Sequence, residues 1–480
     1  MTDSIYPHGS LVLRGGEVID GSGAARFAAD VIVGGDSILA VVAPGKASAD
    51  RTLDVSGRIV CPGFVDSHSH DDQRVLERTV PHAKLSQGVC TVVTGNCGIS
   101  IAPLNTSNPP APLDMLGRDV FRFSRFADYL AALDKARPAV NVVPLVGHIS
   151  IRVKHVHDLE QPACAAGIEA MYREVAEAMD AGAFGLSTGV YYPPARAADT
   201  AELHGVCAAL GGRDAVLAMH IRDEGDLVSD ALREALAVGA HSGARLVISH
   251  HKVMGPANHG RTRETLGMVD DARLRQNVCL DCYPYEASST MLDAAKAARI
   301  RNVLITWSSP HPEFSGRTLK SVAEHWGVGL QEAAGRLMPG GAIYFSMSQE
   351  DVDRVMAHPA TMIGSDGLPH DQMPHPRLWG TFPRVLGHYS RERKLFPLET
   401  AVHKMTGLPA HHFGIRGRGL LKAGNFADLV VFDPARVRDG SSYQNPTAPA
   451  IGIDAVLVNG QIAVWKGDVV ESHAGRRLVP

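Results

Sequence analysis

Short apolar runs alternate with glycine-containing turns at both ends of the chain, and this pattern predicts β-hairpins. The apolar runs lie at residues 11–13, 18–19, 31–33, 38–42, 427–434 and 456–460. Their two-residue period is typical of strands with one face buried. We therefore predict one small β-sandwich or β-barrel domain that both termini build together, from residues 1–61 and 415–480.

The middle of the chain has a different pattern, in which strand-like apolar runs alternate with helical segments. The runs lie at residues 59–65, 89–93, 142–146, 183–186, 216–219, 246–248, 278–280 and 362–363. One connecting helix is clear, because Ile168, Met171, Val175 and Met179 recur three and four residues apart. This alternation predicts an α/β fold, a (β/α)₈ TIM barrel over residues 62–414. The long gap before the last strand predicts an insertion at the barrel mouth, at about 284–345.

Composition and charge exclude several classes of protein. The 480 residues include 47 Lys+Arg against 51 Asp+Glu, and a net charge of -4 provides no electrostatic footprint for nucleic acid. We find no signal-peptide pattern and no apolar run of the roughly 18 residues that a membrane span needs. The seven cysteines are dispersed and odd in number, which argues against a disulfide framework. We expect a cytoplasmic protein with a small-molecule substrate and no nucleic-acid or membrane partner; its oligomeric state stays open.

Polar side chains suited to metal binding follow five of the predicted barrel strands. They are His68 and His70 after the first strand, Cys97 after the second, His220 after the fifth, His250 after the sixth and Asp366 after the eighth. Each residue alone is weak evidence of a site, since a lone buried cysteine or histidine is usually structural. The carboxyl ends of parallel barrel strands meet at one rim, and imidazole nitrogen and thiolate sulfur are natural Zn²⁺ ligands. The conjunction predicts a metal centre.

Several longer motifs surround these residues. They are PGFVDSHSH at 62–70, VTGNCG at 93–98, GLSTG at 185–189, SHHK at 249–252, GSDGLP at 364–369, PHPRLWG at 374–380 and GNFADLV at 424–430. With these motifs, nearly the whole chain resembles the amidohydrolase superfamily and, within it, the family of N-acyl-D-amino-acid deacylases (D-aminoacylases).

The resemblance implies a zinc enzyme with one tight site and a second, weaker one. It places Cys97, His220 and His250 at the tight position, and His68 and His70 at the second. Cyclic-amide hydrolases of the superfamily usually carry a carboxylated lysine at the end of strand 4. This chain has no lysine between Lys154 and Lys252, so the departure argues against a hydantoinase or dihydroorotase.

The implied reaction is hydrolysis of an N-acyl-D-amino acid to a carboxylate and a free D-amino acid. Bound Zn²⁺ lowers the pKa of a water ligand from about 15.7 towards about 7 and polarises the amide carbonyl. By the resemblance, Asp366 acts as general base and then as general acid. The resemblance also places Lys252, Tyr283, Ser289 and Arg377 around the substrate carboxylate, and Tyr192 near the scissile carbonyl.

The substrate side chain is the least determined part of the prediction. Apolar pocket candidates are Met291, Leu292, Tyr344 and Met347 in or beside the insertion, and Tyr191 after strand 4. They favour neutral substrates, such as derivatives of D-Met, D-Leu or D-Phe. An inward-facing Lys296 or Arg299 would instead favour N-acyl-D-glutamate or N-acyl-D-aspartate, but we interpret both as the exposed face of a helix over 294–299.

Other functions remain as alternatives. A dipeptidase-like or deaminase-like amidohydrolase would use the same rim for another substrate. A metal-free barrel would be a structural or interaction protein, although each expected ligand position is filled here. A hydrolase with Cys97 as nucleophile would need no metal.

Overall fold

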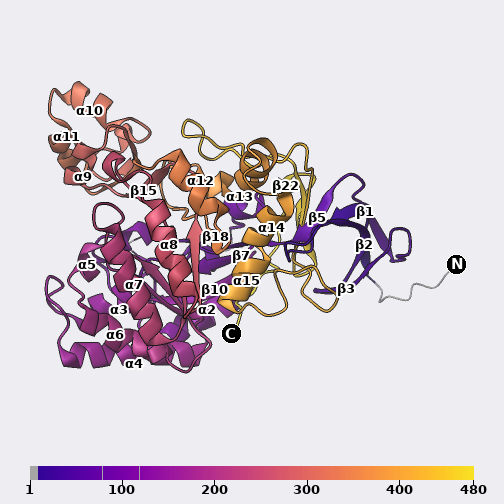
Figure 1. Ribbon diagram of the computed structural model, residues 1–480, viewed down its shortest axis with the longest axis horizontal. Coiled ribbons are helices and arrows are strands. Elements are labelled where there is room, and N and C mark those ends of the chain that lie inside the picture. The colour runs from indigo at the N-terminus through magenta and orange to yellow at the C-terminus, as the bar shows by residue number, and fades with distance from the viewer. Residues whose placement is uncertain (1–8, 78, 118) are drawn as a thin grey trace.

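A barrel lies at the centre of the molecule, between the inserted segment at one end and the sheet of the two termini at the other (Figure 1). The computed structural model describes residues 9–77, 79–117 and 119–480. Among the helices in these ranges, none has the length and apolar character that crossing a bilayer requires.

Eight parallel strands form the barrel, as the alternating pattern predicts. In sheet order they are β6 (Phe64–Asp66), β7 (Val89–Thr94), β10 (Asn141–Gly147), β11 (Gly185–Gly189), β12 (Val216–His220), β13 (Arg245–Ile248), β14 (Val278–Cys282) and β18 (Thr361–Ile363). The first and last strands approach each other where Ser67 N donates to Ile363 O at 3.4 Å and Asp366 N donates to His68 O at 2.8 Å. The barrel is therefore nearly closed, and its two ends meet beside the predicted metal ligands.

Helices surround the barrel strands. The main ones are α2 (Phe126–Ala136), α3 (His148–His155), α4 (Ala165–Ala181), α6 (Thr200–Cys207), α7 (Val228–Ser242), α8 (Thr262–Arg273), α12 (Gln349–Ala357), α13 (Arg377–Arg384), α14 (Leu398–Met405) and α15 (Gly407–Phe413), with the single turns α1 (His82–Leu85) and α5 (Pro193–Arg196). In α4, Met171 and Val175 of the predicted face are fully buried, as is Ala178, whereas Ile168 and Met179 are half-buried. The helix ends at Gly182, whose positive φ of 111° suits glycine.

The insertion after β14 is a small unit with its own core. It contains a three-stranded antiparallel sheet, β15 (Ala287–Met291), β16 (Val303–Ser308) and β17 (Gly340–Phe345), with α9 (Ala294–Arg299), α10 (Leu319–Trp326) and α11 (Leu330–Leu337). Leu292, Ile305 and Tyr344 belong to that core. Met373 N, in the loop after β18, donates to Thr306 O at 3.0 Å, so the insertion contacts the rim of the barrel.

Both termini contribute to one nine-stranded sheet, as predicted. Its strands are β1 (Leu11–Val18), β2 (Phe27–Gly34), β3 (Ser37–Val42), β4 (Arg51–Asp54), β5 (Ile59–Pro62), β19 (Leu429–Phe432), β20 (Ile453–Val458), β21 (Gln461–Trp465) and β22 (Asp468–Val469). Apolar residues are buried on both faces, because Leu11 and Leu13 of β1 join one cluster while Val12 between them joins another.

The single strand predicted over 59–65 is wrong, because the chain divides at Gly63. Pro62 still pairs with Leu429 in the terminal sheet, whereas Phe64 already pairs with Val89 in the barrel. A Cβ on Gly63 would lie only 2.4 Å from the Cys90 sulfur, so this crossing between sheets requires glycine. Because the residues on both sides of Gly63 are apolar, the sequence pattern does not show that the strand divides there. The predicted residue limits of the two domains remain a prediction.

Candidate metal centre

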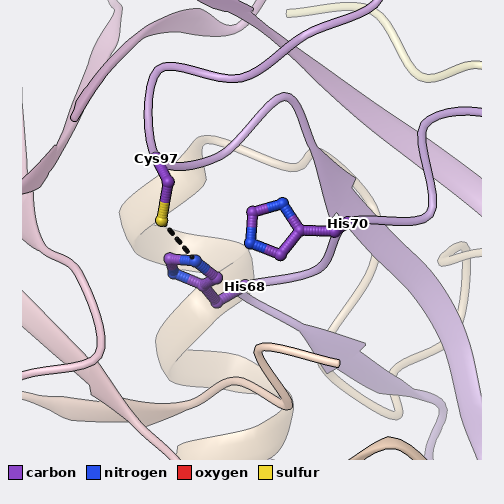
Figure 2. A group of neighbouring side chains, drawn as sticks. All are labelled: His68, His70 and Cys97. Carbon is purple, nitrogen blue, oxygen red and sulfur yellow. Dashed lines mark hydrogen bonds between the residues drawn. The ribbon is translucent and has the colours of Figure 1, made fainter. Parts of the chain in front are cut away.

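The predicted metal-binding side chains converge at the rim formed by the carboxyl ends of the barrel strands. Cys97 Sγ lies 3.2 Å from His68 Nε2 and 3.4 Å from His250 Nε2. His250 Nε2 is in turn 3.1 Å from His220 Nδ1. Figure 2 shows the Cys97 sulfur directed at the His68 ring, with the His70 ring beside it.

Two groups of three ligands share the same cysteine. The ligand atoms of Cys97, His220 and His250 lie within 4.8 Å of one another, and so do those of His68, His70 and Cys97. All five side chains are buried. The arrangement therefore offers one sulfur between two pairs of imidazoles.

Three residues at this rim have positive φ angles, which are unusual outside glycine. Cys97, His250 and Asp366 have φ angles of 57°, 36° and 48°, and they are three of the seven non-glycine residues with positive φ in the described ranges. Such conformations are uncommon outside glycine and persist where the surrounding structure enforces them, often at functional sites. Beside Cys97, a Cβ on Gly95 would lie 2.0 Å from Leu145 O, so the turn that presents the thiol depends on glycine.

The charge balance favours the thiolate of Cys97. Burial raises the pKa of a thiol, but His68 and His250 beside it hold the pKa of Cys97 well below its usual range. The thiolate is the form of cysteine that binds metal. The cysteine is therefore in the ionised form that a zinc ion requires.

Asp366 lies directly beside the imidazoles. Its Oδ1 is 3.3 Å from His70 Nε2 and 3.6 Å from His68 Nε2, and its Oδ2 is 2.9 Å from an Arg377 nitrogen. Burial alone would raise the pKa of Asp366, but Arg377 and His70 hold it well below its ordinary value. The carboxylate is therefore ionised and able to accept a proton at the rim.

A model of the amidohydrolase family matches residues 51–306 and 316–464. The chain belongs to the amidohydrolase family. It is 52% identical over 470 residues to a D-aminoacylase of Alcaligenes xylosoxydans xylosoxydans. The aligned region covers 98% of this chain and 97% of that relative.

Solved structures of related amidohydrolases agree with this assignment. One is a D-aminoacylase structure from work on the binuclear metal center, one-metal activation and second-metal attenuation. It has a TM-score of 0.95 and 51% identity to this chain, over 98% of this chain and 99% of that chain. An N-acyl-D-glutamate deacylase from Bordetella bronchiseptica, complexed with zinc and a phosphonate inhibitor, has a TM-score of 0.95 and 45% identity over the same shares. The resemblance inferred from the motifs is thus confirmed.

The fourth barrel strand of this amidohydrolase, β11, consists of Gly-Leu-Ser-Thr-Gly and contains no lysine. A carboxylated lysine therefore cannot arise there, and the buried Cys97 occupies the position between the two pairs of histidines.

Polar groups predicted to bind a carboxylate gather on one side of the centre. The Arg377 guanidinium is buried, lies 4.5 Å from the centroid of the Tyr283 ring and donates to Ser289 O at 3.1 Å. Within the described ranges, the Tyr283 hydroxyl, Ser289 Oγ and Arg377 Nε have no hydrogen-bond partner. Buried polar atoms usually have partners, so these three are candidates for contact with an anionic ligand.

Lys252 has a different environment from these three residues. Its amine donates to Glu224 Oε1 at 2.6 Å and to His250 O at 3.0 Å, and it lies 5.7 Å from the Tyr283 ring centroid. The positive charge of Lys252 is therefore already paired with a carboxylate of the protein.

Two tyrosines after β11 line the other side of the centre. Tyr191 stacks on His220 with centroids 4.9 Å apart, and Tyr192 meets the same imidazole edge-on at 5.0 Å. The Tyr192 hydroxyl lies 3.3 Å from Thr290 Oγ1 in β15, which connects the rim to the insertion.

The remaining pocket candidates do not form one group. Met347 lines a small cavity with His250, Lys252 and Tyr283, and Tyr191 is not part of its lining. Leu292 packs in the core of the insertion, while Met291 is half-buried in β15.

The interpretation of Lys296 as an exposed residue is wrong. Helix α9 forms as predicted and Arg299 is exposed, but Lys296 is half-buried. The Lys296 amine donates to the Tyr191 hydroxyl at 3.1 Å and lies 4.6 Å from the Tyr344 ring centroid. Helical periodicity identified the helix, but it does not show which side chains bend towards a neighbouring loop.

The sequence analysis did not identify two carboxylates that contact the metal-binding histidines, Asp281 and Glu224. Asp281 lies 3.2 Å from His68 Nδ1 and accepts a hydrogen bond from His250 N at 2.7 Å. Glu224 Oε1 lies 3.1 Å from His250 Nδ1. A charged residue inside the apolar strand β14 was a usable signal for Asp281, whereas Glu224 lies in a loop without any motif.

A buried cluster of charged and polar side chains lies next to the metal ligands. The fully buried Lys84 amine is 2.7 Å from Asp66 Oδ2, 2.9 Å from Ser365 Oγ and 3.0 Å from Asp71 Oδ2. Asp66 ends β6 and Ser365 follows β18, so this cluster fastens the two ends of the barrel next to His68 and Asp366.

Proposed function

We propose that this protein is a zinc-dependent amidohydrolase that hydrolyses N-acyl-D-amino acids to a carboxylate and a free D-amino acid. One observation carries the proposal: the Cys97, His220 and His250 donor set shares its sulfur with His68 and His70, and the ionised Asp366 lies 3.3 Å from His70 and is paired with Arg377. The relatives named above act on N-acyl-D-amino acids, and the preference for the D enantiomer comes from them.

The chemistry of the donor set fits zinc. One thiolate with a lowered pKa and two imidazole nitrogens match the three protein ligands of a catalytic zinc site. When bound there, the ion lowers the pKa of a water and polarises the amide carbonyl. We assign the tight position to Cys97, His220 and His250, and a second, weaker position to His68 and His70 with the shared sulfur.

Asp366 moves the proton in this mechanism. Its carboxylate accepts a proton from the attacking water and then passes it to the departing amine nitrogen, which makes it a general base followed by a general acid. The ion pair with Arg377 keeps the carboxylate ionised before the reaction.

The rest of the rim orients the substrate. Arg377 Nε, the Tyr283 hydroxyl and Ser289 Oγ, which lack a hydrogen-bond partner among the described residues, bind the α-carboxylate. A guanidinium suits this role because it can donate two parallel hydrogen bonds to one carboxylate. Lys252, whose charge is paired with Glu224, lies beside the Tyr283 ring at this site. Tyr192 faces the scissile carbonyl beside His220.

The proposal predicts strict enantiomer discrimination by the zinc-loaded protein. We expect release of free amino acid from N-acetyl-D-methionine or N-acetyl-D-glutamate, with at least about 100-fold lower kcat/KM for the L forms, a difference of roughly 2.7 kcal/mol. Initial rates on N-acetyl, N-formyl and N-succinyl D- and L-amino acids test this, with metal content measured on the same sample. Hydrolysis of neither enantiomer, together with deamination of a purine or pyrimidine, would favour the deaminase alternative.

The side-chain preference has two candidates. Met347, which lines a small cavity with His250 and Tyr283, keeps D-Met, D-Leu and D-Phe derivatives as the first prediction. The placement of Lys296 favours acidic side chains instead, because its amine contacts Tyr191 and Tyr344 and no carboxylate pairs with it in the described ranges. N-acyl-D-glutamate and N-acyl-D-aspartate are therefore the second candidate.

Replacement of Lys296 distinguishes the two candidates. If acidic substrates are preferred, Lys296→Met should lower kcat/KM for N-acetyl-D-glutamate by roughly 10- to 100-fold, since a charge-assisted hydrogen bond contributes about 1.5–3 kcal/mol. The rate with N-acetyl-D-methionine should not fall. Arg299→Met on the same helix is the matched control, because this side chain is exposed. If the wild-type protein already prefers the methionine derivative and Lys296→Met changes nothing, the neutral candidate stands.

A further inference from the structure

Glu224 contacts both imidazoles of the proposed tight metal site. It follows β12 in a loop, and it is buried together with both histidines. Its Oε1 lies 3.1 Å from His250 Nδ1 and 3.6 Å from His220 Nε2. One carboxylate oxygen therefore faces the outward nitrogen of each ring.

The two rings point opposite nitrogens at the centre. His220 offers Nδ1 and His250 offers Nε2, and these two atoms are 3.1 Å apart. A nitrogen that binds metal has no proton, so a neutral ring must carry its proton on the other nitrogen. The outward N–H of His250 then has Glu224 Oε1 as its acceptor at 3.1 Å, because the ammonium of Lys252 beside the same nitrogen cannot accept. His220 Nε2 has no hydrogen-bond partner in the described ranges, and Glu224 Oε1 lies 3.6 Å from it. The two rings are then in different tautomers.

Lys252 completes the group. Its amine lies 2.6 Å from Glu224 Oε1, so it matches the buried carboxylate charge, and 2.7 Å from His250 Nδ1, the nitrogen that Glu224 also faces. The Glu224 backbone oxygen separately accepts from Met254 N at 2.7 Å. The fold of this loop thus has a backbone link that a change of side chain does not remove.

We infer that Glu224 is a positioning residue that fixes the tautomer and orientation of both His220 and His250 for metal binding. Metal-bound imidazoles usually donate their second N–H to a carboxylate or carbonyl, which orients the ring and raises its basicity. Glu224 serves two ligands at once, and Lys252 keeps its charge balanced. The inference rests on the proposed metal site and not on the identity of the substrate.

The test is the zinc affinity of Glu224→Gln, measured on the full chain by competition with a chelator of known affinity. We expect the zinc dissociation constant to rise roughly 10- to 100-fold, the usual effect of removing such a partner. The melting temperature of the metal-free protein shows whether the variant is folded. Asp226→Asn is the matched control, because this carboxylate is exposed in the same loop, and its affinity should equal that of wild type.

A second variant covers the case in which an unpaired Lys252 prevents folding. Glu224→Gln combined with Lys252→Met removes both charges of the buried pair, and the same loss of zinc affinity is expected. Wild-type affinity in either folded variant would overturn the inference, and so would an equal loss in Asp226→Asn. Zinc affinity is read without substrate, so this inference and the proposed deacylase activity fail separately.

Discussion

Asp366→Asn should lower kcat for N-acyl-D-amino acid hydrolysis by roughly 10²- to 10⁴-fold, the usual contribution of general acid–base catalysis. The amide keeps nearly the same shape but cannot accept the water proton. Zinc content should stay normal, because Asp366 is outside the Cys97, His220 and His250 set. Initial rates and elemental analysis of the same preparation measure both quantities.

Asp371→Asn is the matched control for this substitution. Asp371 is half-buried in the same loop, and desolvation raises its pKa to about 7, so an uncharged amide is close to its native state. We expect nearly wild-type turnover from this variant. Near-wild-type turnover in Asp366→Asn itself would refute the proton-transfer role, and loss of its zinc would show that Asp366 is a ligand instead.

Cys97→Ala should abolish both tight zinc binding and hydrolysis. The sulfur is the one ligand shared by both groups of donors, so its removal weakens both positions. The loss of zinc affinity should exceed the roughly 10- to 100-fold typical of an outer partner. Competition with a chelator measures the affinity, and rates at saturating zinc measure the remaining activity.

Cys207→Ala controls for the loss of a buried thiol away from the rim. Cys207 lies at the end of α6, and burial raises its pKa to about 12, so it remains a thiol. Zinc content and rate should be unaffected. If Cys97→Ala lost activity but retained zinc at wild-type affinity, the cysteine-nucleophile alternative would gain and the ligand role would fail.

The barrel was predictable because almost every strand contains a short apolar run and the connections between strands are helical. Seven of the eight predicted runs overlap one barrel strand each, and the eighth, 59–65, crosses from β5 into β6. A continuous apolar run carries no signal of which sheet it joins. The close approach of Gly63 to Cys90 that divides this run depends on tertiary structure.

The metal ligands were predictable from their positions, but their partners were not. The carboxyl ends of parallel barrel strands meet at one rim, so His68, Cys97 and His250 lie there independently of how the loops fold. The contacts of Glu224 depend on the path of the loop after β12, which no sequence period determines. The pairing of Arg377 with Asp366 likewise depends on how the loop after β18 folds back over the rim.

Lys296 illustrates the same limit for specificity. Its helix was predicted correctly, yet its amine contacts Tyr191, which is distant in sequence. Because Tyr191 stacks on His220, this contact places a positive charge one aromatic ring away from His220, a proposed zinc ligand. Side-chain preference therefore follows from the insertion as well as from the barrel.

The central claim is that a zinc ion held by Cys97, His220 and His250 is needed for cleavage of N-acyl-D-amino acids. The most direct test follows hydrolysis of N-acetyl-D-methionine and N-acetyl-D-glutamate before chelation, after removal of metal, and after return of one equivalent of zinc. The account predicts activity that disappears with the metal and returns with zinc, on the D enantiomer of at least one of the two substrates. Full activity in metal-free protein, or activity confined to the L enantiomers, would contradict it.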